Sequence, residues 1–180
     1  HAKNTGVGSY SYYLCTALAK EGMDIEVWSQ KGEGLLEYVD TIDGSNNKIT
    51  VKRVWSKNID GLFSLIKMIW HKKPKVLHIQ HEFSIFGGAF SAVLSPLLPI
   101  FARVLGVKVV TTMHGGFGLD QIDSSFIKEN GYNIPPFMVK LAFIFIFGLI
   151  AHSSNKIIVH EHFQKDELVD EFKIAPASKF

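Results

Sequence analysis

The sequence predicts an α/β fold in which a parallel β-sheet is covered by helices on both faces. Segments rich in β-branched residues alternate along the chain with segments whose apolar residues recur at helical spacing. This alternation favours parallel strands, because each strand then returns through a crossover helix. The length, 180 residues, suits one domain with its own core.

The first half of the chain is expected to hold two helices and three strands. Apolar positions from Val7 to Ala19 recur at helical spacing and Gly22 is a suitable stop, so residues 7–21 predict a helix. A second helix is expected at 59–72, ended before Pro74. The strands are expected at residues 24–29, 48–55 and 75–80. The Gly-, Asn- and Asp-rich loop at 30–48 leaves room for one short strand.

The second half continues the alternation. Residues 87–105 predict a helical region that Pro96 and Pro99 must kink or split. The segments that follow are a strand at 107–113, a short helix at 121–130, an apolar helix at 136–153, a strand at 155–160 and a helix at 162–172.

Composition limits the functional class. The net charge is only +2 and no basic stripe stands out, so no nucleic-acid partner is expected. The lone Cys15 cannot form an internal disulfide, so we interpret it as a small buried apolar residue. Its lack of a partner also favours a reducing, cytoplasmic setting. The chain begins at a loop without a signal peptide and stops without a cap, so we expect a piece of a longer protein.

Ligands of open parallel sheets bind beyond the carboxyl ends of the strands. His114 is the strongest candidate there, because an imidazole can bond a substrate hydroxyl or carbonyl and the glycines behind it leave the backbone uncovered. The alternative is that His114 is a structural histidine whose ring nitrogens hydrogen-bond within the protein. The residues that follow the expected strands are Ser29, His81, Glu82, His114, Gly115, Gly116, Glu161 and His162.

Two glycine-containing loops are further candidates. In NTGVGS, Gly6 and Gly8 would let backbone N–H groups approach a phosphate at a helix N-terminus, or they form an ordinary helix entry. In HEFSIFGG, Gly87 and Gly88 permit close backbone approach, or the segment is a loop with a paired Glu82 and a helix cap. The HEH at 160–162 lacks a third ligand nearby, so we expect no metal site.

Two apolar stretches raise the question of a membrane. Residues 83–102 carry no charge, but glycines and prolines interrupt them, which favours a buried crossover. Residues 141–151, LAFIFIFGLIA, are too short to span and suit either a core helix or a helix in a membrane interface. Five lysines would favour an anionic leaflet: Lys67, Lys72, Lys73, Lys75 and Lys140.

Taken in order, four segments resemble the N-terminal domain of a family 4 glycosyltransferase, the Rossmann-like N-terminal half of a GT-B fold. They are GVGSYSYYLCTALAKEGMDIEVWS (6–29), HEFSIFGG (81–88), VVTTMHG (109–115) and NKIIVHEHFQKDEL (155–168). The resemblance implies retaining transfer, of hexosyltransferase type, from a nucleotide sugar to a glycan or lipid-linked acceptor. It also implies front-face attack, in which the leaving phosphate takes the acceptor's proton.

The resemblance further implies roles for particular residues. His114 would contact the donor sugar as the catalytic residue, while Gly6, Gly8 and Gly115 would approach the donor phosphate and sugar. The domain would hold the acceptor, for which the candidates are His81, Glu82, Gly87 and Gly88. A first strand is expected before residue 1, and a C-terminal donor domain outside these 180 residues, which alone would be inactive.

A non-catalytic Rossmann-like module that binds a nucleotide or a partner remains the alternative. A dehydrogenase cofactor domain is disfavoured, because Ser11 replaces the third glycine of GxGxxG and Ser29 stands where a ribose-binding carboxylate is needed. The enzyme is expected in the cytoplasm, peripheral on the cytoplasmic face of a membrane, with no metal or other cofactor.

Overall fold

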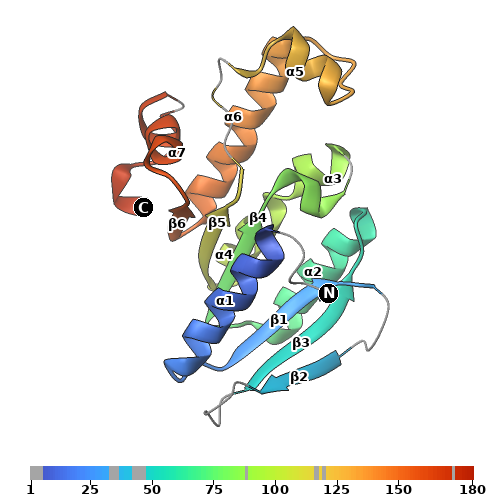
Figure 1. Ribbon diagram of the computed structural model, residues 1–180, viewed down its shortest axis with the longest axis vertical. Coiled ribbons are helices and arrows are strands. Elements are labelled where there is room, and N and C mark those ends of the chain that lie inside the picture. The colour runs from blue at the N-terminus through green and yellow to red at the C-terminus, as the bar shows by residue number, and fades with distance from the viewer. Residues whose placement is uncertain are drawn as a thin grey trace. The chain divides into compact units, whose positions relative to one another are not determined.

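The structure is a computed structural model that describes residues 6–32, 37–41, 48–87, 89–115, 118, 121–171 and 173–180. The chain divides into two compact units, His1–Leu65 and Ile66–Phe180, each considered below by itself. Helices and strands alternate along both units (Figure 1). The α/β class expected from the sequence is confirmed, with parallel strands flanked by helices.

The first unit is built on a three-stranded sheet in the order β1-β3-β2. β1 runs parallel to β3, as expected, whereas the short strand β2 pairs antiparallel with β3. α1 packs on β1 and β3. The elements of this unit are α1 (Gly6–Lys20), β1 (Ile25–Gln30), β2 (Glu37–Thr41), β3 (Lys48–Trp55) and the start of α2 (Ile59–Lys72).

The entry into α2 requires a glycine. The side chain of Asn58 accepts a hydrogen bond from the N–H of Gly61 at 2.9 Å. A Cβ added to Gly61 would overlap the carbonyl oxygen of Ser56. The chain therefore turns into α2 with its backbone in close contact, which any side chain at this position would disrupt.

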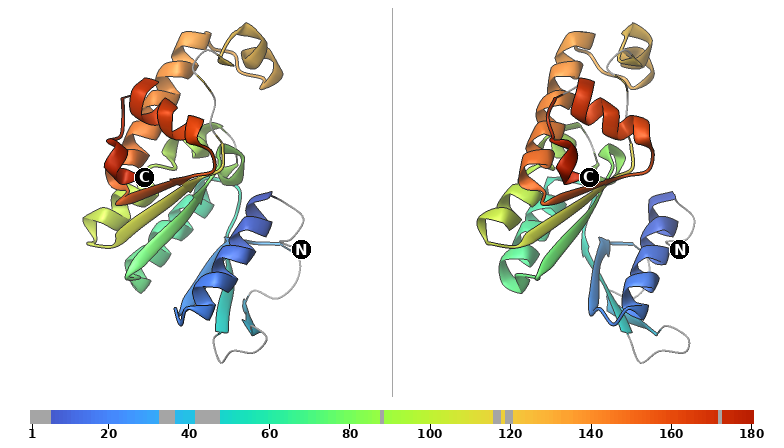
Figure 2. Two further views of the ribbon diagram at one scale, coloured as in Figure 1. Left: turned by 60° about the vertical axis from the view of Figure 1, so that its left-hand side comes forward. Right: turned by 90° about the vertical axis from the view of Figure 1, so that its left-hand side faces the viewer.

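The second unit holds three parallel strands in the order β4-β5-β6, which lie side by side in Figure 2. Among the described residues, each unit thus holds one three-stranded sheet. The strands here are β4 (Val76–His81), β5 (Lys108–Met113) and β6 (Lys156–Val159). The helices are α3 (Ala89–Leu94), α4 (Leu97–Val104), α5 (Ser124–Glu129), α6 (Pro136–Ser153) and α7 (His162–Asp166).

Residues 83–102 form separate short helices. A 3₁₀ helix spans Phe83–Phe86, and α3 ends at Leu94 before α4 begins at Leu97. Pro96 has no N–H to continue the ladder of α3, which explains the split predicted from the prolines. The last helix also breaks: α7 is followed by a single π-helical turn, Glu167–Glu171.

Strand alternation divides the second sheet into two chemically different faces. Ile79, Val109 and Ile157 point to one face and are almost completely buried. Met113 and Ile157 on that face join a core cluster with Val139, Phe143 and Phe147 of α6. The opposite face carries polar residues toward the carboxyl ends of the strands: His78 and Gln80 from β4 and Thr112 from β5.

Helix α6 is apolar all round. It is the one described helix that is long and apolar enough to cross a membrane, with a mean hydropathy of 1.8, and 39% of it is buried in the unit. It has 18 residues, longer than the apolar segment 141–151. Its buried face supplies Phe143 and Phe147 to the core, while Phe137, Leu141 and Phe145 are exposed at helical spacing. α6 is therefore a core helix with a second, exposed apolar face.

Candidate active site

Toward their carboxyl ends, β4, β5 and β6 bring His78, His114 and His160 together in what we call the histidine cluster. Register aligns Gln80 with Thr112 and His81 with Met113, so the strands end at the same edge of the sheet. His114 follows β5 directly, and its backbone N–H donates to the carbonyl oxygen of His81 at 2.9 Å. That bond continues the ladder by one residue and fixes the main chain from which the His114 side chain projects.

Both ring nitrogens of His114 have partners. Its Nε2 lies 2.6 Å from Oε1 of Gln80 on β4. Its Nδ1 lies 3.0 Å from Nε2 of His160, the residue after β6. The rings of His114 and His160 are tilted by 44° with their centroids 4.8 Å apart. One step earlier on the same face, His78 Nε2 pairs with Thr112 Oγ1 at 2.8 Å. Polar side chains thus bridge the three strands in sequence.

The surroundings favour a neutral His114. Its pKa is lowered first by burial, then by the neighbouring His160 and His78, while the carboxylate of Glu82 acts in the opposite direction. Burial also lowers the pKa of His78. An uncharged imidazole at neutral pH can donate from one nitrogen and accept at the other, which suits it to hold a hydroxyl group.

His81 does not lie where a ligand would meet it. The sequence suggested that it follows the strand, but β4 continues to His81, whose side chain points to the core face and is 3% exposed. Its Nε2 pairs with Ser95 Oγ at 3.0 Å, and burial lowers its pKa to about 4. The structure therefore corrects His81 from an acceptor-side candidate to a buried histidine of the core.

The remaining candidates are distributed over several segments. Glu82 follows β4 and is half-buried, and Gly87 ends the 3₁₀ helix with a φ of 101°, a conformation that favours glycine. A Cβ added to Gly115 would meet no atom of the described residues within 4 Å, so none of these residues covers the backbone just behind His114. Gly88 and Gly116 lie outside the described residues.

Gly6 and Gly8 belong to the first unit. They form the first turn of α1, and a Cβ at Gly6 would meet no atom of the described residues within 4 Å. An approach of backbone to phosphate at this helix start stays a prediction.

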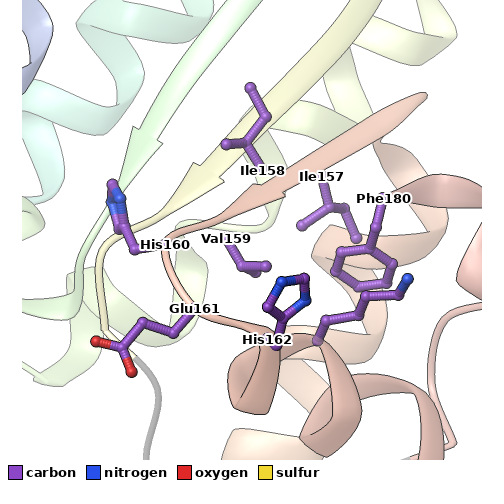
Figure 3. A pocket seen from close by; sticks show the side chains of 8 residues that line it. Ile157, Ile158, Val159, His160, Glu161, His162 and Phe180 are labelled. Carbon is purple, nitrogen blue, oxygen red and sulfur yellow. The ribbon is translucent and has the colours of Figure 1, made fainter.

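A cavity of about 430 Å³ opens beside β6 and α7. Figure 3 shows the side chains of His162 and Phe180 gathered on one side of it, while His160 points away from them. The cavity adjoins the histidine cluster through His160, which lines it. Its lining residues are Ile157, Ile158, Val159, His160, Glu161, His162, Lys165 and Phe180.

No three His, Cys, Asp or Glu side chains converge as metal ligands among the described residues. His160 reaches His114 rather than a third ligand near His162. Metal independence stays a prediction.

A model of glycosyltransferase family 4 matches residues 4–179, nearly the whole chain. The chain belongs to glycosyltransferase family 4. The match confirms the family inferred from the four sequence segments. No curated protein matches the chain significantly.

Within this family 4 domain, sequence reasoning missed two partners of its main candidate. Gln80 was not among the predicted site residues, and His160 entered only through the HEH segment, weighed as a metal pair. The signal that could have found Gln80 is alternation, since His78 and Gln80 break the apolar pattern of β4 on the same face. His160 is brought to His114 by the pairing of β5 with β6.

Proposed function

We propose that the family 4 domain forms the acceptor side of a retaining hexosyltransferase, which moves a sugar from a nucleotide donor to a glycan or lipid-linked acceptor. The observation that carries the proposal is His114, a neutral imidazole at a strand end beside backbone at Gly115 that none of the described residues covers. In this proposal His114 contacts the donor sugar. The nucleotide is held by a second domain, as the family resemblance implies.

The chemical step follows from the same proposal. The bond between the anomeric carbon and the diphosphate breaks, a bond to the acceptor oxygen forms on the same face, and the acceptor's proton passes to the leaving phosphate. The family resemblance implies that backbone amides of a glycine-containing loop stabilise the charge that develops on the phosphate, for which Gly6 and Gly8 are the candidates. His114 orients hydroxyls in this step and does not transfer the proton.

Replacement of His114 tests the role. In the full-length protein, screened against a panel of nucleotide sugars, we expect His114→Ala to lower kcat by about 10²–10³-fold, the usual cost of one transition-state hydrogen bond. The matched control is His152→Ala, an exposed histidine at the end of α6, near the amino end of β6. Near-normal turnover of a folded His114→Ala protein would contradict the role. Binding of a nucleotide sugar without any turnover in wild type would favour the non-catalytic module.

We further propose that the exposed face of α6 contacts the surface of an anionic membrane on its cytoplasmic side. Phe137, Leu141 and Phe145 are each about three-fifths exposed and follow one another at i, i+4 and i+8. Lys140 lies on the same helix and Lys128 is exposed on α5. Apolar insertion and attraction of lysines to anionic lipid are each modest, so the binding would be reversible. A lipid-linked acceptor would suit such a surface.

Sedimentation with phosphatidylserine–phosphatidylcholine vesicles tests the membrane contact. We expect binding at low salt that weakens as salt is added, and that weakens again in a Leu141→Ser, Phe145→Ser double variant. Phe90→Ser is the control, since Phe90 is 70% exposed but lies on α3. A folded protein that ignores these vesicles at low salt would refute the contact, and one that resists both salt and carbonate would instead be an integral membrane protein.

A further inference from the structure

The two partners of the His114 ring differ in their surroundings. Gln80 lies within β4 and is half-buried, at 2.6 Å from Nε2. His160 follows β6, is exposed to solvent, and lies 3.0 Å from Nδ1. Gln80 is thus held within the sheet, whereas His160 lies at its solvent-exposed edge.

The Gln80 contact determines which nitrogen of His114 carries the hydrogen. Oε1 of Gln80 has no hydrogen and can only accept, so Nε2–H of His114 must donate to it. A neutral imidazole has one N–H, which leaves Nδ1 of His114 with a lone pair. Nδ1 therefore accepts a hydrogen bond from Nε2–H of His160.

We propose that Gln80 is a positioning residue that holds His114 as the Nε2–H tautomer, and that His160 occupies at Nδ1 the place of a donor-sugar hydroxyl. On binding, the hydroxyl of the sugar donates to Nδ1 and His160 turns outward. This inference rests on the proposed function for the identity of the ligand. Its tautomer part stands on the Gln80 contact alone.

The exchange is energetically feasible because one hydrogen bond replaces another. His160 is exposed, so its ring can take water as a partner when it leaves, whereas a half-buried Gln80 would lose its partner in the sheet. Nδ1 accepts only while His114 is neutral. His78 and His160 disfavour the protonated form of His114, whereas Glu82 favours it. His81, on the core face of the sheet, is also a neighbour of His114.

The tautomer can be measured in the ligand-free, full-length protein. Two-bond ¹H–¹⁵N spectra of ¹⁵N-histidine protein separate protonated from unprotonated ring nitrogens, and His114→Ala identifies the signals of this ring. We expect hydrogen on Nε2 in wild type and a mixture of tautomers in Gln80→Leu, which keeps a side chain of similar size without the acceptor. Hydrogen on Nδ1 in wild type, or a spectrum unaffected by Gln80→Leu, would overturn the positioning role.

Kinetics with the donor that wild type turns over test the exchange. We expect Gln80→Leu to lower kcat by about 10-fold, which corresponds to the loss of about one neutral hydrogen bond. His160→Ala should lower KM about 5-fold, because the sugar no longer displaces a hydrogen bond. A KM that stays the same or rises in His160→Ala would overturn the placeholder role.

A conservative change separates orientation from structure. Gln80→Glu keeps an acceptor for Nε2–H, but its carboxylate should raise the pKa of His114 and shift the acidic limb of kcat/KM to higher pH. An unshifted limb would contradict direct contact during turnover. If no nucleotide sugar is turned over by wild type, the proposed function fails, while the spectra still decide whether Gln80 sets the tautomer.

Discussion

Two phenylalanines of α6, two residues apart, should respond very differently to the same substitution. Phe143 is 6% exposed and packs among the rings of Phe83 and Phe147, with centroids 4.7 and 5.7 Å away. Phe145 is 62% exposed. Truncation of a buried Phe to Ala costs about 3–5 kcal/mol, and loss of the ring pairs moves Phe143 toward the upper value. An exposed position of this kind usually stays within about 0.5 kcal/mol.

Thermal unfolding of Phe143→Ala and Phe145→Ala would measure the difference. For a domain of this size each kcal/mol shifts Tm by about 2–4 °C, so we expect Phe143→Ala to unfold roughly 6–20 °C lower and Phe145→Ala close to wild type. Equal shifts would show that the two faces of α6 do not differ as the burial indicates. The same difference explains why the membrane test changes Leu141 and Phe145: a change at the buried Phe143 would destabilise the core and could not report on lipid binding alone.

Three other outcomes follow from particular contacts. Gly61→Ala should cost about 1–3 kcal/mol in urea unfolding, because its Cβ would overlap Ser56, whereas Gly6→Ala meets open space; equal costs would refute the contact. His81 has its pKa lowered from 6.5 to about 4, so the unfolded chain binds more protons between these values. Its contribution is complete above pH 6.5, and on the order of 3 kcal/mol should be lost as the pH falls to about 4; His81→Gln should lack this loss, and parallel urea titrations of both proteins would refute it. Sugar transfer should persist in EDTA, and activity lost in EDTA and restored by Mn²⁺ or Mg²⁺ would contradict metal independence.

The sequence predicts best those elements whose limits are set by local chemistry. β3, α2 and α6 have the bounds predicted for them, because alternation, helical spacing and Pro74 mark their ends. For β2 the sequence showed only that a short strand was possible, since a short strand in a Gly- and Asn-rich loop depends on its antiparallel partner β3. Local pattern does not report such pairing.

The site was predicted less completely than the fold. His114 was placed at a strand end from the apolar run before it and the glycines behind it. The predicted strand ended at residue 80, one residue before the observed end of β4 at His81. Because successive side chains of a strand point to opposite faces, His81 lies on the core face. Gln80 and His160 are 34 and 46 residues from His114 in sequence, so their contacts depend on a register that one sequence does not specify.

The geometry of the site depends on the register of the second sheet, because side chains of neighbouring strands hydrogen-bond to one another there. His78 reaches Thr112 and Gln80 reaches His114, each two residues beyond the residue it is aligned with. Deletion of one residue within β4 would turn Ile79 out of the core and Gln80 into it at the same moment. A one-residue slip between these strands therefore loses the histidine cluster and the core together.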